Sequence, residues 1–150
     1  MALSANKITR RKSAPTIKKL KVVDGAVHIY NGANLNYEAG NIGYVMPATD
    51  VLSAEFAGIA LEELNVAAAD NASDGDHSVS VLTRGCGEEI LMTMSVSITI
   101  ANEGDPVYAE DDEKVGISGV TNTTGGLVGI IRQFISTTTA WVQMVQSPVL

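Results

Sequence analysis

The apolar and polar residues of this chain alternate in short runs. The clearest run covers residues 92–100, where Met, Val and Ile alternate with Thr and Ser in the sequence MTMSVSITI. Alternation with a period of two points one set of side chains into a core and the other toward water or a polar neighbour. The pattern therefore predicts a long strand over residues 92–100, with one apolar face and one hydroxyl face.

Other apolar runs are shorter and are separated by residues that favour turns. The dipeptide Asp24-Gly25 divides the first of them, and Pro47 ends another. Strands are expected at residues 21–30, 42–46, 77–82, 107–108, 115–117, 127–135 and 140–145. Short strands with frequent turns are typical of a small β-barrel or β-sandwich. The sequence therefore predicts a mainly-β fold with a single domain over residues 21–150.

Residues 51–64 fit two interpretations. The apolar positions of VLSAEFAGIALEEL fall near helical spacing, and Ala and Glu favour a helix. Gly58 in the middle of the run argues instead for a strand with a bulge or a close backbone approach. The local pattern slightly favours the helix. An α+β fold with a short helix near residues 51–64 is therefore the alternative to the mainly-β fold.

The first 20 residues differ from the rest of the chain in pattern and in charge. They have no apolar periodicity, and Pro15 interrupts them. Seven of the 10 Lys and Arg residues precede Val23, and all 17 Asp and Glu residues follow it. Such a segment buries too little surface to offset its ordering entropy. The sequence therefore predicts an extended basic arm over residues 1–20, attached to an acidic body.

The arm is expected to bind an acidic protein surface. It contains no aromatic residue to stack on bases, and the acidic body would repel a nucleic acid backbone. Nucleic acid is therefore not an expected partner. The candidate contact residues in the arm are Lys7, Arg10, Arg11, Lys12, Lys18 and Lys19.

Composition argues against several other classes of protein. No run approaches the roughly 18 apolar residues that a membrane helix needs, and the basic N-terminus lacks the apolar segment of a secretory signal. Cys86 is the single cysteine, so there is no disulfide framework. We expect a soluble protein made in a reducing cytoplasm, with no membrane partner.

Two segments of the chain resemble each other. Residues 38–60 and residues 103–131 each begin with an acid and a glycine, continue with a Tyr–Val strand and a polar gap, and end in apolar residues around Gly-Ile. This comparison pairs Tyr44-Val45 with Val107-Tyr108, and Gly58-Ile59 with Gly129-Ile130. An internal duplication is one explanation of the likeness.

Some of the same segments resemble a known family. The runs FAGIAL (56–61), GDPVYAEDDEKV (104–115), LVGII (127–131) and AWVQM (140–144) look like those of capsid decoration, or cement, proteins of tailed bacteriophages. The likeness covers the layout of residues 22–144 but only a few motifs in identity, of which GDPVY is the most specific. The long basic arm and the Asn-rich loop at residues 31–41 depart from the family pattern.

The resemblance implies a compact β-rich fold, often called a β-tulip, and a strand over residues 54–62. It also implies a protein with no enzymatic activity and no cofactor. Such a protein binds the major capsid protein on the outer surface of the head, commonly as a homotrimer and sometimes as a dimer. The arm residues would then contact the capsid lattice.

Three groups of residues contain side chains suited to chemistry. Cys86 lies near Arg84, which would lower a thiol pKa, and His77 is a possible base. The run DNASDGDH at residues 70–77 gathers oxygen ligands suited to a hard cation. The acidic run AEDDE at residues 109–113 suits a basic arm from a neighbouring subunit. A small turn residue, a solvated turn and a solvated hairpin tip are the simpler explanations, and we predict no catalytic or metal-binding residue.

We therefore expect a structural virion protein that decorates and stabilises a phage capsid. The alternatives are another virion component, such as a tail-tube or head-fibre base protein, or a small metal-binding enzyme. Trp141 and Val145 lie on the face of the last strand opposite Ala140, Val142 and Met144, so both faces of this strand carry apolar residues. Because a small barrel has one interior, Trp141 and Val145 are predicted at a subunit interface.

Overall fold

The computed structural model describes residues 17–38, 40–49, 55–117 and 126–145, and in these the chain is mainly β. The mainly-β prediction is therefore confirmed. The twelve strands are β1 (Ile17–Val22), β2 (Val27–Ile29), β3 (Asn34–Glu38), β4 (Asn41–Pro47), β5 (Glu55–Ala60), β6 (Leu64–Val66), β7 (Ser78–Thr83), β8 (Glu89–Met94), β9 (Pro106–Ala109), β10 (Lys114–Ile117), β11 (Leu127–Ser136) and β12 (Thr139–Met144). Two short 3-10 helices, η1 (Ala68–Asp70) and η2 (Ile100–Asn102), lie between them.

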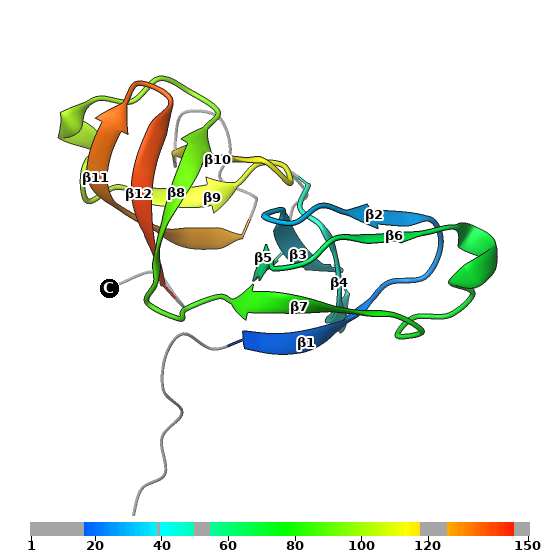
Figure 1. The fold of residues 1–150 in the computed structure, drawn as a ribbon. Coiled ribbons are helices and arrows are strands. Elements are labelled where there is room, and N and C mark those ends of the chain that lie inside the picture. The colour runs from blue at the N-terminus through cyan, green and yellow to red at the C-terminus, as the bar shows by residue number, and fades with distance from the viewer. Residues whose placement is uncertain (1–16, 39, 50–54, 118–125, 146–150) are drawn as a thin grey trace, which may run out of the picture.

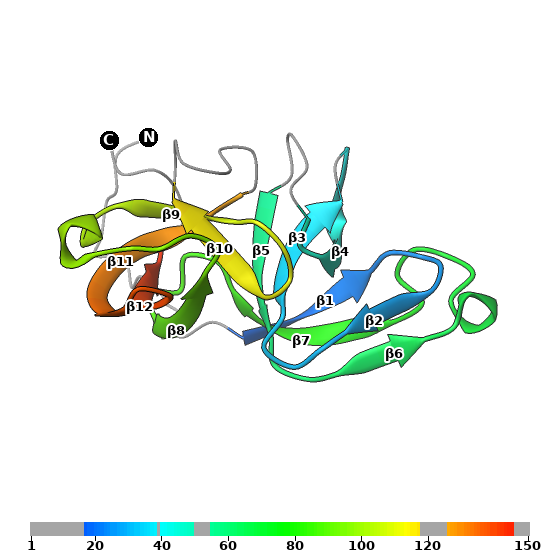
Figure 2. The same cartoon turned by 90° about the horizontal axis from the view of Figure 1, so that it is seen from above.

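The strands form two closed five-stranded barrels that lie side by side (Figures 1 and 2). The N-barrel has the strand order β1-β4-β3-β5-β7, and the C-barrel has the order β10-β8-β12-β11-β9. A two-stranded ribbon of β2 and β6 belongs to the first half of the chain and extends beside the N-barrel. The body therefore holds two barrels where the sequence predicted one.

The two barrels have the same topology. In each, the first strand pairs in parallel with the third, and the four other pairings are antiparallel. Following the registers round both barrels matches β1 with β8, β3 with β9, β4 with β10, β5 with β11 and β7 with β12. The match also holds for single residues. Val22 of β1 pairs with Val45 of β4, and at the equivalent positions Met94 of β8 pairs with Val115 of β10. The fold is thus an internal duplication.

This duplication corrects part of the sequence comparison. Gly58 and Gly129 are equivalent, since they pair with Leu35 and Val107 at equivalent positions of β3 and β9. The other predicted pairing is wrong, because Tyr44 lies in β4, which matches β10, whereas Val107 lies in β9. Adjacent hairpin strands carry similar short motifs, so a short motif does not distinguish one from the other.

Each barrel has an apolar core, and the core of the C-barrel extends onto the N-barrel. The N-barrel core is built around Val22, Leu35 and Val45, each fully buried. The larger cluster fills the C-barrel and also includes Phe56 and Leu82, whose side chains point outward from the N-barrel. Backbones also meet here, because a Cβ atom placed on Gly126 would lie 2.0 Å from the Phe56 nitrogen. The two barrels are therefore packed as one unit.

Polar contacts join the barrels on another side. The Asn34 backbone N–H donates to the Asp112 carbonyl over 2.8 Å, and the Asn34 side chain donates to the Asp111 carbonyl over 3.2 Å. Asn34 is 4% exposed, so these bonds satisfy a buried amide. The acidic loop at the start of β10 is thus attached to β3.

Residues 92–100 do not form one strand. The strand ends at Met94, after which the Ser95 N–H donates to the Val115 carbonyl and the Ile98 N–H donates to the Thr137 carbonyl, both over 2.9 Å. The chain thereby crosses the end of the barrel and buries Ile98 fully, while Ile100 is 69% exposed. A segment that closes a barrel buries alternate residues as a strand does, which explains why the sequence pattern was misleading.

Two expected boundaries also change. Within residues 51–64, strands β5 and β6 replace the short helix favoured by local spacing, and residues 50–54 lie outside the described part of the chain. The arm was predicted to end at residue 20, but β1 begins at Ile17 and pairs with β4 and β7. Lys18 and Lys19 therefore belong to the N-barrel. The basic residues Lys7, Arg10, Arg11 and Lys12 lie outside the described residues.

Candidate interaction surfaces

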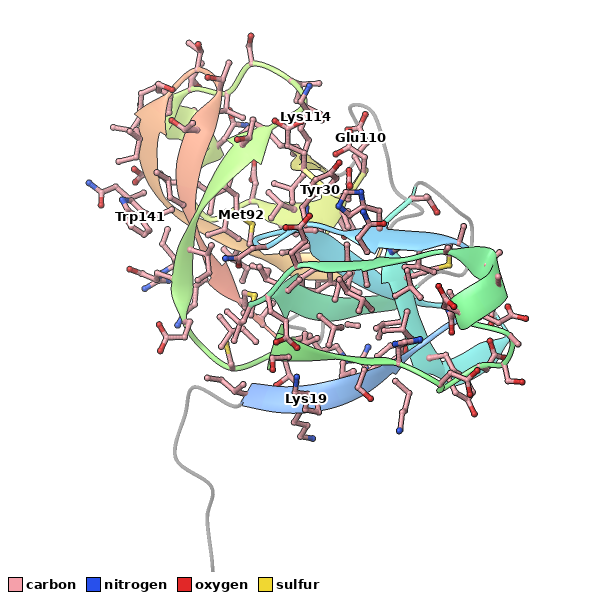
Figure 3. All side chains as sticks on the ribbon, turned by 45° about the vertical axis from the view of Figure 1, so that its right-hand side comes forward. Lys19, Tyr30, Met92, Glu110, Lys114 and Trp141 are labelled. Atoms are coloured by element: carbon pink, nitrogen blue, oxygen red, sulfur yellow. The ribbon has the colours of Figure 1, made fainter. Side chains whose placement is uncertain are left out.

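The outer face of the C-barrel carries a group of partly exposed apolar side chains. On β12, Ala140, Val142 and Met144 point into the core, and the alternate residue Trp141 points outward. Trp141 pairs with Leu91 on β8 and with Gln133 on β11. Leu91 is 51% exposed. Figure 3 shows Trp141 on the side of the C-barrel that faces away from the N-barrel.

Polar and uncharged residues surround this pair. Thr93 and Thr139 pair with each other two residues further along β8 and β12. Ile135 on β11 is 47% exposed. The nearest charged residues are Glu89, at the start of β8, and Arg132, which directly precedes Gln133 on β11; they lie 3.8 Å apart. Val145, the other predicted interface residue, is partly buried, and its N–H donates to the Val128 carbonyl over 3.3 Å. We call Leu91, Thr93, Gln133, Ile135, Thr139 and Trp141 the C-barrel outer face.

The basic residues of β1 lie on the outside of the N-barrel. Lys18 and Lys19 are both exposed, and Lys19 projects outward in Figure 3. The Lys19 ammonium donates to a Glu62 carboxylate oxygen 2.5 Å away, and the same oxygen accepts from the Ser80 N–H over 2.7 Å. These bonds lower the pKa of Glu62 below its ordinary value of 4.5, chiefly through Lys19 and then through the Ser80 N–H. Lys19 is therefore already paired within its own chain.

A cleft of about 400 Å³ opens where the ribbon approaches the acidic loop. It is lined by Tyr30, Asn31, Gly32, Ala33, Asp112 and Glu113. Tyr30 is 56% exposed, and its ring centroid lies 4.0 Å from that of His28. Asp111 is not among these lining residues, and its Oδ1 accepts from the Glu113 and Lys114 backbone N–H groups over 2.8 and 2.6 Å. The acidic run is a structured turn that joins the barrels.

The cysteine and the histidine considered for chemistry lie at opposite ends of β7. The six residues of this strand separate His77 from Arg84 and Cys86, a span of roughly 20 Å in an extended chain. His77 Nε2 lies 2.8 Å from the Asp70 carbonyl, and Arg84 donates to Glu55 over 3.0 Å. Cys86 is buried in the cluster shared by the barrels. These residues are thus not positioned to act together.

The loop over residues 70–77 uses its polar side chains to hold the turn at residues 23–25 and its own backbone. The Asn71 amide donates to the carbonyls of Val23 and Gly25 over 2.8 and 2.9 Å. Asp74 Oδ1 accepts from the Asp24 N–H over 2.8 Å, and Asp76 Oδ2 accepts from the Ser73 N–H. Within the described residues, no three His, Cys, Asp or Glu side chains are grouped to hold a metal ion.

Comparison with known proteins leaves the family open. The chain matches no protein-family model, no curated protein and no solved structure. In the part of the chain that the structure describes, no helix is long and apolar enough to span a membrane. The surfaces themselves therefore carry the functional argument.

Proposed function

We propose that this protein is a structural component of a phage head, which binds the capsid lattice from outside and stabilises it. The observation that carries the proposal is the separation of charge. The segment before Ile17 contains four basic residues and no acid, whereas the two-barrel body that follows contains six basic residues against 17 acids. A basic segment attached to a rigid acidic module suits attachment to an acidic protein surface, with the module left outside.

The remaining features agree with a binding module. The reactive groups that could suggest an enzyme have structural roles in this body, as hydrogen-bond donors or acceptors in turns or as core side chains. The outer face of the C-barrel offers an apolar contact surface. Several modest contacts made by one oligomer at fixed lattice sites bind far more tightly than one contact alone. The partners proposed are the major capsid protein and further copies of this chain, and the family resemblance favours a trimer.

The test is binding of the purified protein to phage heads that lack it. We expect saturable binding on the outer surface, weakened when residues 1–16 are deleted. The deletion stops at residue 16 because Ile17 begins β1 and its removal would damage the barrel. A matched variant replaces Lys7, Arg10, Arg11 and Lys12 by Gln and keeps the length of the arm.

Both variants are expected to bind heads more weakly. Their affinity should also depend less on salt, because the contribution of exposed charges is the part that salt screens, beyond about 8 Å near physiological ionic strength. Lys21→Gln, on the exposed surface of β1, serves as a control for loss of one positive charge from the body. Absence of binding to such heads would overturn the proposed function. Equal affinity with and without the four basic residues would show that the arm is not a capsid contact.

A further inference from the structure

The duplicated fold provides an internal control for the C-barrel outer face. Leu91 and Trp141 are paired across β8 and β12, and the equivalent pair across β1 and β7 is Lys19 and Ser80. Both pairs point outward from barrels of the same topology. The N-barrel has a lysine and a serine at these positions and is still a closed barrel, so the fold does not require apolar residues there. Leu91 and Trp141 therefore need an explanation other than barrel stability.

The N-barrel shows how an apolar outer face is covered in this molecule. Phe56, Ile59 and Leu82 point outward from β5 and β7 and are between 1% and 7% exposed. They belong to the cluster that fills the C-barrel, so one barrel covers the outer face of another. The equivalent residues of the C-barrel are Leu127 and Ile130 on β11 and Gln143 on β12, which are partly exposed. Trp141 follows Gln143 on the same face of β12, and Leu91 lies beside it on β8. Among the described residues, no other element covers Leu91 and Trp141 to the same extent.

We propose that a second copy of this chain docks on the C-barrel outer face, with Leu91 and Trp141 at the centre of the contact. The charge distribution favours this occupant. The chain carries a net charge of −7, so two copies repel each other over most of their surfaces. The six residues of this face are uncharged, and the two charged residues that border it, Glu89 and Arg132, have opposite signs and lie 3.8 Å apart. Copies can approach here with the least repulsion.

The composition of the face also fits a protein contact of this kind. A central Trp beside an exposed Leu, surrounded by Thr and Gln, has the apolar centre and polar rim of protein interfaces. Trp is also among the residues that contribute most to binding energy when they are covered. Neighbouring sheets pack face to face at about 10 Å, and β8, β12 and β11 are three adjacent strands that can offer such a contact.

The experiment uses the single tryptophan as a local probe. The full-length protein is followed by analytical ultracentrifugation and by Trp141 emission over a concentration series reaching about 1 mM, where even weak contacts form. We expect self-association, with the emission shifting to shorter wavelength along the same concentration curve. The stoichiometry follows from the same data, and either a dimer or a closed ring supports the proposal.

Two variants place N-barrel residues on the C-barrel. Leu91→Lys keeps the tryptophan, and Trp141→Ser removes it; each introduces the residue that the equivalent position of the N-barrel already contains. Both are expected to fold, and each to weaken self-association by at least about tenfold, as for a central contact residue. Ile100→Ser, which removes a 69% exposed side chain outside this face, is the control and should associate normally.

This inference specifies the surface for the self-association that the proposed function includes, and the outcomes separate it from binding to heads. A protein that stays monomeric at the highest concentration, with Trp141 emission unchanged, overturns the inference. If this monomer binds heads and its tryptophan is shielded only there, the face contacts the capsid, and the proposed function survives. Self-association that Leu91→Lys leaves unaltered also overturns the inference. Association through this face without binding to heads supports the inference and contradicts the proposed function.

Discussion

Gly58 and Gly129 occupy the same position in the two barrels, and the neighbouring strand approaches both in the same way. A Cβ atom on Gly58 would lie 2.2 Å from the Leu82 carbonyl oxygen, and one on Gly129 would lie 2.1 Å from that of Gln143. Leu82 and Gln143 are themselves equivalent, since each pairs with an equivalent isoleucine, Ile59 or Ile130. A pairing irregularity directly precedes each glycine. The duplication thus preserves a bulge together with the glycine that it requires.

Alanine at either glycine should destabilise the protein. Because the added Cβ would overlap backbone atoms, which cannot move aside as a flexible side chain can, we expect a loss of about 1–3 kcal/mol in each variant. Chemical denaturation measures the free energy of unfolding. Gly104→Ala is the control, since Gly104 has a φ of +95° but nothing within 4 Å of a new Cβ, so it reports backbone strain alone. A stability loss no greater in Gly129→Ala than in Gly104→Ala would contradict the close approach.

Phe56 should couple the stability of the two barrels. Its side chain extends from the N-barrel into the cluster that fills the C-barrel and is 1% exposed. We expect Phe56→Ala to cost about 3–5 kcal/mol through lost burial and the remaining cavity. Trp141 emission reports the C-barrel, and its midpoint in denaturant should fall together with the loss of strand signal in circular dichroism.

A suitable control for Phe56 is Ile100→Ala, which removes an exposed side chain and should change stability by less than about 0.5 kcal/mol. Two separate transitions in the Phe56 variant, with the Trp141 transition unmoved, would show that the barrels unfold independently.

Asn71 should stabilise the turn between β1 and the ribbon. It is 1% exposed, and its amide donates to the Val23 and Gly25 carbonyls. Asn71→Ala leaves these carbonyls without their donor, which costs about 1–3 kcal/mol. Thermal unfolding compares this variant with Asn65→Ala, where the asparagine is exposed on β6. Equal stability of the two variants would argue against the Asn71 bonds.

Glu62 should make a pH-dependent contribution to stability. Its pKa is lowered in the folded protein, so the unfolded chain binds the proton more readily. Its stabilising effect is therefore present above the ordinary pKa of 4.5 and is lost as the pH falls through the lowered value. The effect is small because the group is exposed. The difference in melting temperature between wild type and Glu62→Gln should thus be present at neutral pH and disappear in acid.

Carboxyl NMR titration gives the direct measurement for Glu62. Replacement of Lys19 by Met should move the pKa of Glu62 back toward 4.5, because the Lys19 hydrogen bond is the largest cause of the shift. An unshifted Glu62 in the wild-type protein would rule out the contact with Lys19.

The sequence alone determined the fold class and part of the surface. Alternation in the last strand correctly placed Ala140, Val142 and Met144 inside and Trp141 outside, because consecutive side chains of a strand point in opposite directions. It also identified Gly58 and Gly129 as equivalent, since the close approach of a neighbouring strand favours glycine at both positions. These features depend on short-range geometry, which is why a local pattern can report them.

Tertiary structure decided what depends on partners distant in the sequence. Glu55–Ala60 is a strand because β3 and β7 pair with it on either side, which outweighs the helical spacing of its residues. The chain leaves β8 at Met94 because hydrogen bonds to Val115 and Thr137 draw it across the barrel end. The C-barrel has the apolar pair Leu91 and Trp141 where the N-barrel has the polar pair Lys19 and Ser80. This difference can be seen only when the strands of the two barrels are compared in register. Local propensities amount to less than about 1 kcal/mol per residue, so long-range pairing and burial determine these outcomes.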